Sequence, residues 1–137
     1  MTNTAAAVRK MGVAKVGVLA ERFGEQWIVS TLVPKVVECY NVEQQGYNYR
    51  MCALETLSAV MNHLSREMIT EMIVPTVVKA CGDRVPNVQF CVARIIKAQK
   101  AQFDPSIFTA QIVPKLTEMT QEADKDVAYF ATLALQP

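Results

Sequence analysis

A Val-Pro pair recurs through the chain at a nearly constant interval. The three prolines involved, Pro34, Pro75 and Pro114, lie 41 and 39 residues apart. Each pair sits in an apolar stretch whose large side chains recur every four residues, which marks one face of an α-helix. A helical segment that returns at this interval is typical of a chain that folds by stacking copies of one unit.

A second set of residues repeats with the same period between the Val-Pro stretches. Short triplets end at Arg9, Arg50, Gln89 and Ala128, with spacings of 41, 39 and 39 residues. Because two separate sets share one period, we expect two helices per unit: helix A with the Val-Pro pair and helix B with the triplet. The expected A helices cover 26–40, 66–80 and 105–121, and the expected B helices cover 5–22, 48–63, 86–101 and 125–135.

This pattern predicts an all-α fold, an α-solenoid of about three and a half HEAT-type repeats with seven helices. Residues 1–137 then form a single domain with the repeat fragments 1–24, 25–64, 65–103 and 104–137. Ser65 and Asp104 are expected to cap A helices, and the interior prolines are expected to bend them. Gly24, Gly46 and Gly82 fall between helices, where a positive φ would favour glycine.

The two ends of this stack are expected to be apolar. The first B helix has no A partner, and it carries Val13, Val16 and Leu19. The last helix carries Leu133 and Leu135. Since a terminal repeat usually has a polar outer face, the sequence predicts either a fragment of a longer solenoid or end-to-end self-association.

Composition excludes several classes of function. A formal net charge of +1 does not give the chain the strong positive field that proteins use to bind nucleic acid or an anionic membrane surface. No apolar stretch is long enough for a membrane span, and basic residues follow the first small residues, the reverse of a signal peptide. We therefore expect a cytoplasmic or nuclear protein.

No catalytic, cofactor or metal site is expected. Cys39, Cys52, Cys81 and Cys91 have no CxxC spacing and lie in apolar helical surroundings, so they are interpreted as core residues in a reducing compartment. The single histidine, His63, leaves too few ligands for a common zinc site. It lies off the apolar stripe of its helix, so a dyad with Cys39 or Cys52 is not expected.

The aromatic side chains follow the apolar stripes. Phe23, Phe103 and Phe108 are therefore expected in the core. Trp27 opens an A helix and is expected to be a partly buried packing residue. The alternative for Trp27 is an exposed side chain that contacts a partner.

The stretches FGEQWIVSTLVPKVVECYN, GDRVPNVQF and DKDVAYFA closely resemble the C-terminal end of the scaffold (A, or PR65) subunits of protein phosphatase 2A. The likeness extends from about residue 7 to residue 135 with the same repeat phasing. It implies that the turns between helices A and B line up as a ridge that holds the phosphatase catalytic subunit. Most of the regulatory-subunit contact would lie in repeats that this chain does not include.

The resemblance assigns the ridge to Gln45–Arg50, Asp83–Gln89 and Asp124–Tyr129. Where the family commonly has a basic residue, this chain has Gln89 and Ala128, so polar contacts there would be weakened or lost. The candidate partner-binding residues are Tyr47, Tyr49, Arg50, Asp83, Asn87, Val88, Gln89, Asp126, Val127 and Tyr129. For the first three, the alternative is that one tyrosine packs between repeats and that Arg50 pairs with a carboxylate of a neighbouring turn, and Arg50 is expected to do both.

The sequence therefore predicts a scaffold that holds a serine/threonine phosphatase catalytic subunit. One alternative is a HEAT-type transport or assembly adaptor that binds another protein along its concave face. An acidic or Asn-rich inner surface would favour that adaptor, whereas the mixed set of Arg50, Gln89 and Arg94 does not. A second alternative, a helical-bundle enzyme, would need an enclosed pocket with convergent polar groups.

Overall fold

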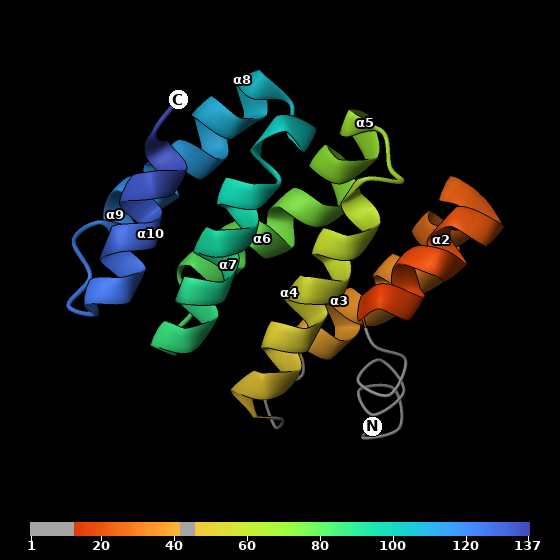
Figure 1. Ribbon diagram of the computed structural model, residues 1–137, viewed down its shortest axis with the longest axis horizontal. Helices are drawn as coiled ribbons and strands as arrows, with labels where there is room; N and C mark the ends of the chain where they lie inside the picture. The colour runs from red at the N-terminus through yellow and green to blue at the C-terminus, as the bar shows by residue number, and fades with distance from the viewer. Residues whose placement is uncertain (1–12, 42–45) are drawn as a thin grey trace.

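The computed structural model describes residues 13–41 and 46–137, and all regular structure within these ranges is helical (Figure 1). This confirms the predicted all-α solenoid. In chain order, the elements are α2 (Val13–Trp27), η1 (Ile28–Leu32), α3 (Val33–Asn41), α4 (Tyr47–Met61), α5 (Arg66–Met68), η2 (Ile69–Ile73), α6 (Val74–Cys81), α7 (Pro86–Ala98), η3 (Lys100–Gln102), α8 (Pro105–Ile107), η4 (Phe108–Ile112), α9 (Val113–Met119) and α10 (Lys125–Leu135). The start of the predicted helix 5–22 lies outside the described residues.

The helices form two layers. The B helices α2, α4, α7 and α10 lie side by side in the front layer of Figure 1, and the A helices, which end in α3, α6 and α9, lie behind them. The first turns of the B helices α4, α7 and α10 lie along the lower edge of that view, which we call the turn edge. The solvent-facing side of the front layer is called the B-layer face.

Each A helix contains a π-helical turn immediately before its Val-Pro pair. These turns are η1, η2 and η4, and in each the backbone N–H of the following valine donates to a carbonyl five residues earlier. Proline has no N–H, and its ring collides with the carbonyl four residues back in a regular α-helix. The wider turn thus accommodates the predicted disruption, at the same place in all three A helices.

Local capping sets the helix starts as predicted. The Ser65 hydroxyl accepts a hydrogen bond from the Met68 N–H, and the Asp104 carboxylate accepts from the N–H groups of Ser106 and Ile107. Asp124 caps α10 in the same way.

The interhelical glycines differ in conformation. Gly24 has φ 83° and ψ 177° and breaks α2 into the end of a B helix and the start of an A helix. Gly46 and Gly82 have negative φ, so the expectation of a positive φ is wrong for them. Only the break at Gly24 therefore requires the conformational freedom of glycine.

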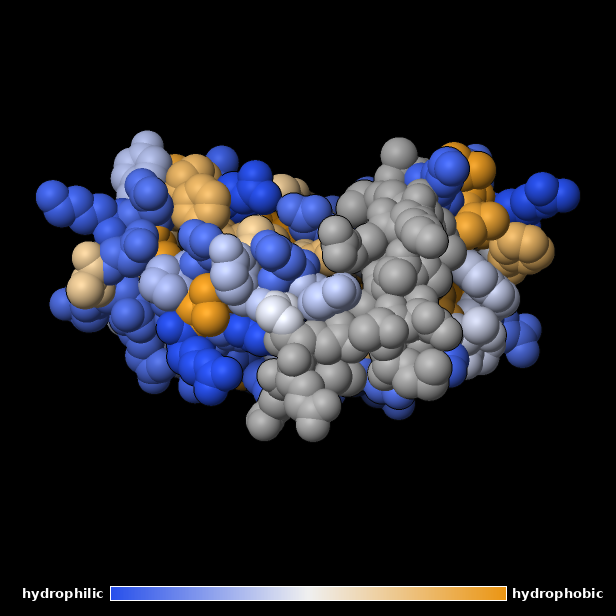
Figure 2. Space-filling model, turned by 90° about the horizontal axis from the view of Figure 1, so that it is seen from below, coloured by the Kyte–Doolittle hydropathy of each residue, from blue (hydrophilic) through white to orange (hydrophobic). Residues whose placement is uncertain are grey.

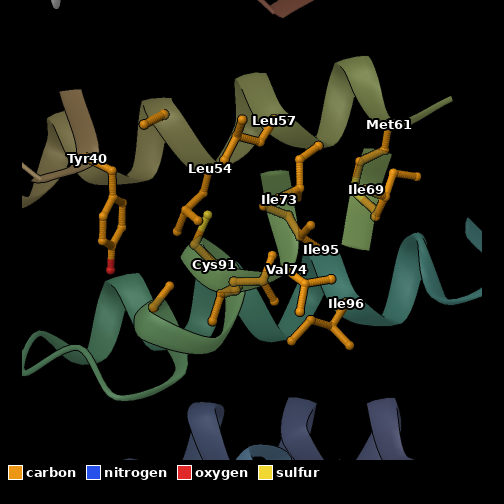
Figure 3. Close-up of a cluster of buried hydrophobic side chains, with 14 of the residues drawn as sticks. Tyr40, Leu54, Leu57, Met61, Ile69, Ile73, Val74, Cys91, Ile95 and Ile96 are labelled. Carbon is orange, nitrogen blue, oxygen red and sulfur yellow. The ribbon is translucent and has the colours of Figure 1, made fainter. Parts of the chain in front are cut away.

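The core lies between the layers and continues from one repeat to the next. In Figure 3, Leu54, Leu57 and Met61 of α4 face side chains of η2, α6 and α7. Ile73 has no exposed surface, and neither does Ile96. Since these side chains come from two successive repeats, neither repeat could bury them alone.

Aromatic and terminal side chains follow the predictions in part. Phe103 and Phe108 are buried and Trp27 is half-buried, as predicted. Phe23 is 54% exposed, and its ring lies on the surface against Trp27 with the two ring centroids 5.2 Å apart, so its assignment to the core is wrong. Val16, expected at an open end, is buried.

Hydrogen bonds connect successive repeats at the edge opposite the turn edge. The Glu25 carboxylate accepts from the Ser65 backbone N–H at 2.7 Å. Between the same two repeats, the Gln99 side chain donates to the Ser58 carbonyl and hydroxyl at 3.0 and 3.1 Å. These bonds fix the position of the repeat 25–64 relative to the repeat 65–103.

The backbone at Gly24 generates a stability prediction. Its combination of φ and ψ is one that essentially only glycine adopts. We therefore expect Gly24→Ala to lower the free energy of unfolding by about 1–3 kcal/mol. Urea denaturation followed by circular dichroism measures this.

Gly17 provides the matched control within the same element. It lies in helical backbone, and no described atom lies within 4 Å of an added Cβ. Gly17→Ala should raise the free energy of unfolding by up to about 1 kcal/mol. Equal effects of the two substitutions would contradict the assigned conformation of Gly24.

Candidate partner-binding site

The first turns of α4, α7 and α10 bring the predicted ridge to the turn edge (Figure 1). Tyr47 is 39% exposed and Tyr129 is 60% exposed. Asn87 and Asp126 are also exposed. Figure 2 views the molecule from this edge, where the surface outside the grey atoms is mainly hydrophilic with apolar side chains interspersed.

The Asp83 carboxylate links two successive repeats at this edge. Arg50 Nε–H donates to Oδ2 at 2.8 Å and Nη2–H donates to Oδ1 at 3.2 Å. The Tyr40 hydroxyl donates to Oδ2 at 3.1 Å, and the Arg50 and Asp83 side chains are only 12% and 7% exposed. We call these three residues the Asp83 cluster. The two hydrogen bonds between Arg50 and Asp83 fix the orientation of both side chains and add to their electrostatic attraction.

The electrostatics of the cluster keep Asp83 ionised. Burial raises the pKa of its carboxyl group, but the hydrogen bonds from Arg50, the Val85 N–H and Tyr40 outweigh burial, and the pKa falls below its usual 3.8. Burial and the nearby Asp83 carboxylate raise the pKa of Tyr40, which stays a neutral donor.

A second inter-repeat contact occurs one repeat later. Gln89 occupies the position equivalent to Arg50, and Glu122 the position equivalent to Asp83, each 39 residues further along. The Gln89 amide donates to Glu122 Oε1 and to the Cys81 carbonyl, both at 3.2 Å. The residue that replaces the family's basic side chain is therefore bonded inside the chain.

The structure separates the predicted site residues into two groups. Val88 and Val127 have no exposed surface, which corrects their assignment to a contact surface: they pack in the core. Gln89 is buried as well. Arg50 and Asp83 form an ion pair with each other, and Tyr49 is half-buried against the core. Gln45 lies outside the described residues. The side chains left to meet a partner are those of Tyr47, Asn87, Asp126 and Tyr129.

An aromatic cluster that the sequence analysis missed adjoins these residues. The Phe90 and Phe130 rings meet edge to face at 4.9 Å, and Tyr129 meets Phe130 at 5.5 Å. The Arg94 guanidinium lies 5.5 Å from the Phe90 ring centroid. The signal in the sequence was that Phe90 and Tyr129 are one period apart, which places the two aromatic residues at equivalent positions of α7 and α10.

The His, Cys, Asp and Glu side chains of the described residues form no metal-binding group. No cluster of three or more His, Cys, Asp or Glu side chains occurs in that part of the chain. Burial raises the pKa of Cys81 to about 12 and that of Cys91 to about 11, so both remain thiols at neutral pH. Burial also raises the pKa of Cys39. In the same residues, no helix is long and apolar enough to cross a membrane.

A sequence similarity to a known protein agrees with this architecture. No sequence model of a known family matches the chain. The chain is 27% identical over 124 residues to the A-type regulatory subunit of the protein phosphatase PP2A of Saccharomyces cerevisiae. The chain is a HEAT-like helical-repeat protein. The alignment covers 85% of this chain but 19% of the yeast protein, so the chain spans about a fifth of that relative's length. Similarity to a regulatory protein of this type supports a scaffold role.

The Asp83 cluster generates a second stability prediction. Asp83→Ala leaves the guanidinium of Arg50 poorly solvated and without its partner, so we expect a loss of about 2–4 kcal/mol in the free energy of unfolding. Glu38→Ala, which removes an exposed carboxylate from α3, should change it by less than about 0.5 kcal/mol. Chemical denaturation compares the two, and a loss at Asp83 no larger than at Glu38 would refute the linking role.

The lowered pKa of Asp83 predicts how this contribution depends on pH. A carboxylate with a folded pKa below its unfolded pKa stabilises the fold above the unfolded value, near 3.8, and loses this effect as the pH falls through the folded pKa. The stability difference between the parent chain and Asp83→Asn should therefore be constant near neutral pH and shrink below pH 3.8. Denaturation curves across this range test it; a difference that grows on acidification would contradict the assignment.

Proposed function

We propose that this chain is a scaffold whose turn edge binds the catalytic subunit of a protein phosphatase 2A-type serine/threonine phosphatase. The similarity to the A-type regulatory subunit of PP2A supports this proposal. The chain presents a surface to the phosphatase and takes no chemical part in dephosphorylation.

One observation carries the proposal: three successive B helices start at one edge with exposed side chains suited to recognition. Tyr47 and Tyr129 combine apolar area with a hydroxyl group, and tyrosine is enriched among the residues that dominate binding energy. Asn87 and Asp126 lie between them in chain order and are also exposed. Recognition commonly uses turns and loops held by a rigid framework, and the inter-repeat bonds supply that framework here.

The absence of a basic side chain at Gln89 and Ala128 changes how the partner would be held. Gln89 is bonded to Glu122, and Ala128 is half-buried. Recognition at this edge then depends on the two exposed tyrosines rather than on a series of cations. We accordingly propose weak dependence of binding on salt concentration.

The proposal predicts the effect of removing both aromatic groups. In calorimetry with the purified catalytic subunit of PP2A, Tyr47→Ala/Tyr129→Ala should weaken binding by a factor of at least about 30, because two exposed aromatic side chains that contact the partner are lost. Both side chains are exposed, so circular dichroism should show an unchanged helical fold.

Phe23→Ala is the matched control, because Phe23 is a comparably exposed aromatic residue that precedes the break at Gly24, away from the turn edge. It should leave the affinity unchanged. A folded parent chain that does not bind, or that loses equal affinity with Phe23→Ala, would overturn the proposal.

A further inference from the structure

The B-layer face carries two rows of side chains that cross successive B helices. The first row consists of Asn48, Asn87 and Asp126, which are exposed at equivalent positions of α4, α7 and α10. One turn further along these helices, the second row consists of the partly exposed Met51 and Phe90 with the exposed Tyr129. A polar row therefore runs beside an apolar row across three repeats.

The two asparagines are suited to binding a peptide backbone. Among the described residues, neither Asn48 nor Asn87 has a hydrogen-bond partner for its side chain. Each amide offers a carbonyl acceptor and an NH₂ donor, the complement of the N–H and C=O groups of one peptide unit. Packed helices lie about 8–10 Å apart, which matches about three residues of extended chain at roughly 3.3 Å each.

The neighbouring surface offers places for side chains of the bound segment. A hollow of about 340 Å³ opens between α4 and α7. Its lining includes the small or apolar residues Ala59, Ile95 and Ala98, with Glu55 and Arg94 beside them. The aromatic cluster lies on the other side of Arg94, which contacts the Phe90 ring. A large apolar side chain can therefore pack against Ala59, Ile95 and Ala98 on this face.

The charged side chains of this face determine which residue of the bound segment fits beside its large apolar side chain. Arg94 and Glu55 are 3.7 Å apart and 47% and 42% exposed, so their mutual attraction is weak and the guanidinium can bind another carboxylate. Lys97, also exposed, lies three residues further along α7. Near the hollow, two cations on α7 face one carboxylate on α4, which favours an acidic side chain of the occupant at that place. The carboxylate of Asp126 lies at the start of α10, at the other end of the face.

We propose that the B-layer face binds an extended, acidic segment of a partner polypeptide that crosses α4 and α7 toward α10. Asn48 and Asn87 hold its backbone, the hollow takes a large apolar side chain, and Arg94 with Lys97 binds an acidic one. A helical occupant would require a continuous apolar groove, whereas polar and apolar rows alternate here. This surface shares Asn87, Asp126 and Tyr129 with the residues proposed to meet the phosphatase, but the hollow, Arg94 and Lys97 lie further along the B helices. Its test uses no phosphatase, so each proposal can fail while the other stands.

The test is selection of a displayed library of random 12-residue peptides on the immobilised full chain. The enriched peptides should contain a large apolar residue close to Asp or Glu. One such peptide is then synthesised with a fluorescent label, and its affinity is measured by fluorescence polarisation. Asn48→Ala/Asn87→Ala should weaken binding at least tenfold, and Arg94→Glu should weaken it as much.

Asn62→Ala is the matched control, because Asn62 is an exposed asparagine at the far end of α4, outside both rows. It should leave the affinity unchanged, and circular dichroism should show all variants helical. The proposal is overturned if no peptide is enriched, if enriched peptides lack acidic residues, or if the double asparagine variant binds as the parent does. An enriched peptide that binds only as a helix would also overturn it.

Discussion

The structure depends on burial that no single repeat can complete. Helix α7 illustrates this: Val88, Cys91 and Val92 have no exposed surface, although one helix pair has too few side chains to cover them all. Helix α7 packs against α4 before it, α10 after it and α6 behind it. The free energy gained from this apolar burial is therefore shared between neighbours, which makes the repeats cooperative over short range. This packing also fixes the positions of the turn edge, the opposite edge and the B-layer face.

The polar contacts between repeats differ in strength along the stack. Arg50 and Asp83 form a nearly buried bidentate ion pair, whereas Gln89 and Glu122 form a single hydrogen bond at the equivalent positions. This internal use of Arg50 and Gln89 also removes them from the inner surface, where they had argued against an adaptor that binds polypeptide. The B helices still expose amide and aromatic side chains beside the charged Arg94 and Lys97, a mixture suited to contact with another chain.

The sequence predicted the structural features that depend on residues close together in the chain. The period, the helix pairs and the caps at Ser65 and Asp104 follow from residues close together in the chain, so pattern and capping chemistry were sufficient. The role of Arg50 was not accessible in this way, because its partner Asp83 lies 33 residues away and both a partner protein and a neighbouring turn could satisfy it. Val88 and Val127 were assigned by position in a motif, which does not reveal burial between helices. Contact between Phe90 and Phe130 likewise requires α7 and α10 to be placed side by side.

The π-helical turns have a consequence for how A helices can change by insertion or deletion. A π-turn corresponds to one extra residue in an α-helix, which turns by about 100° per residue. In η2, Ile69 precedes this extra residue and Val77 of α6 follows it, yet both face the core. Deleting one residue there would regularise the backbone but rotate α6 by about a quarter turn, carrying Val77 away from α7. The A helices are therefore constrained in length, and the recurring Val-Pro interval reflects that constraint in the sequence.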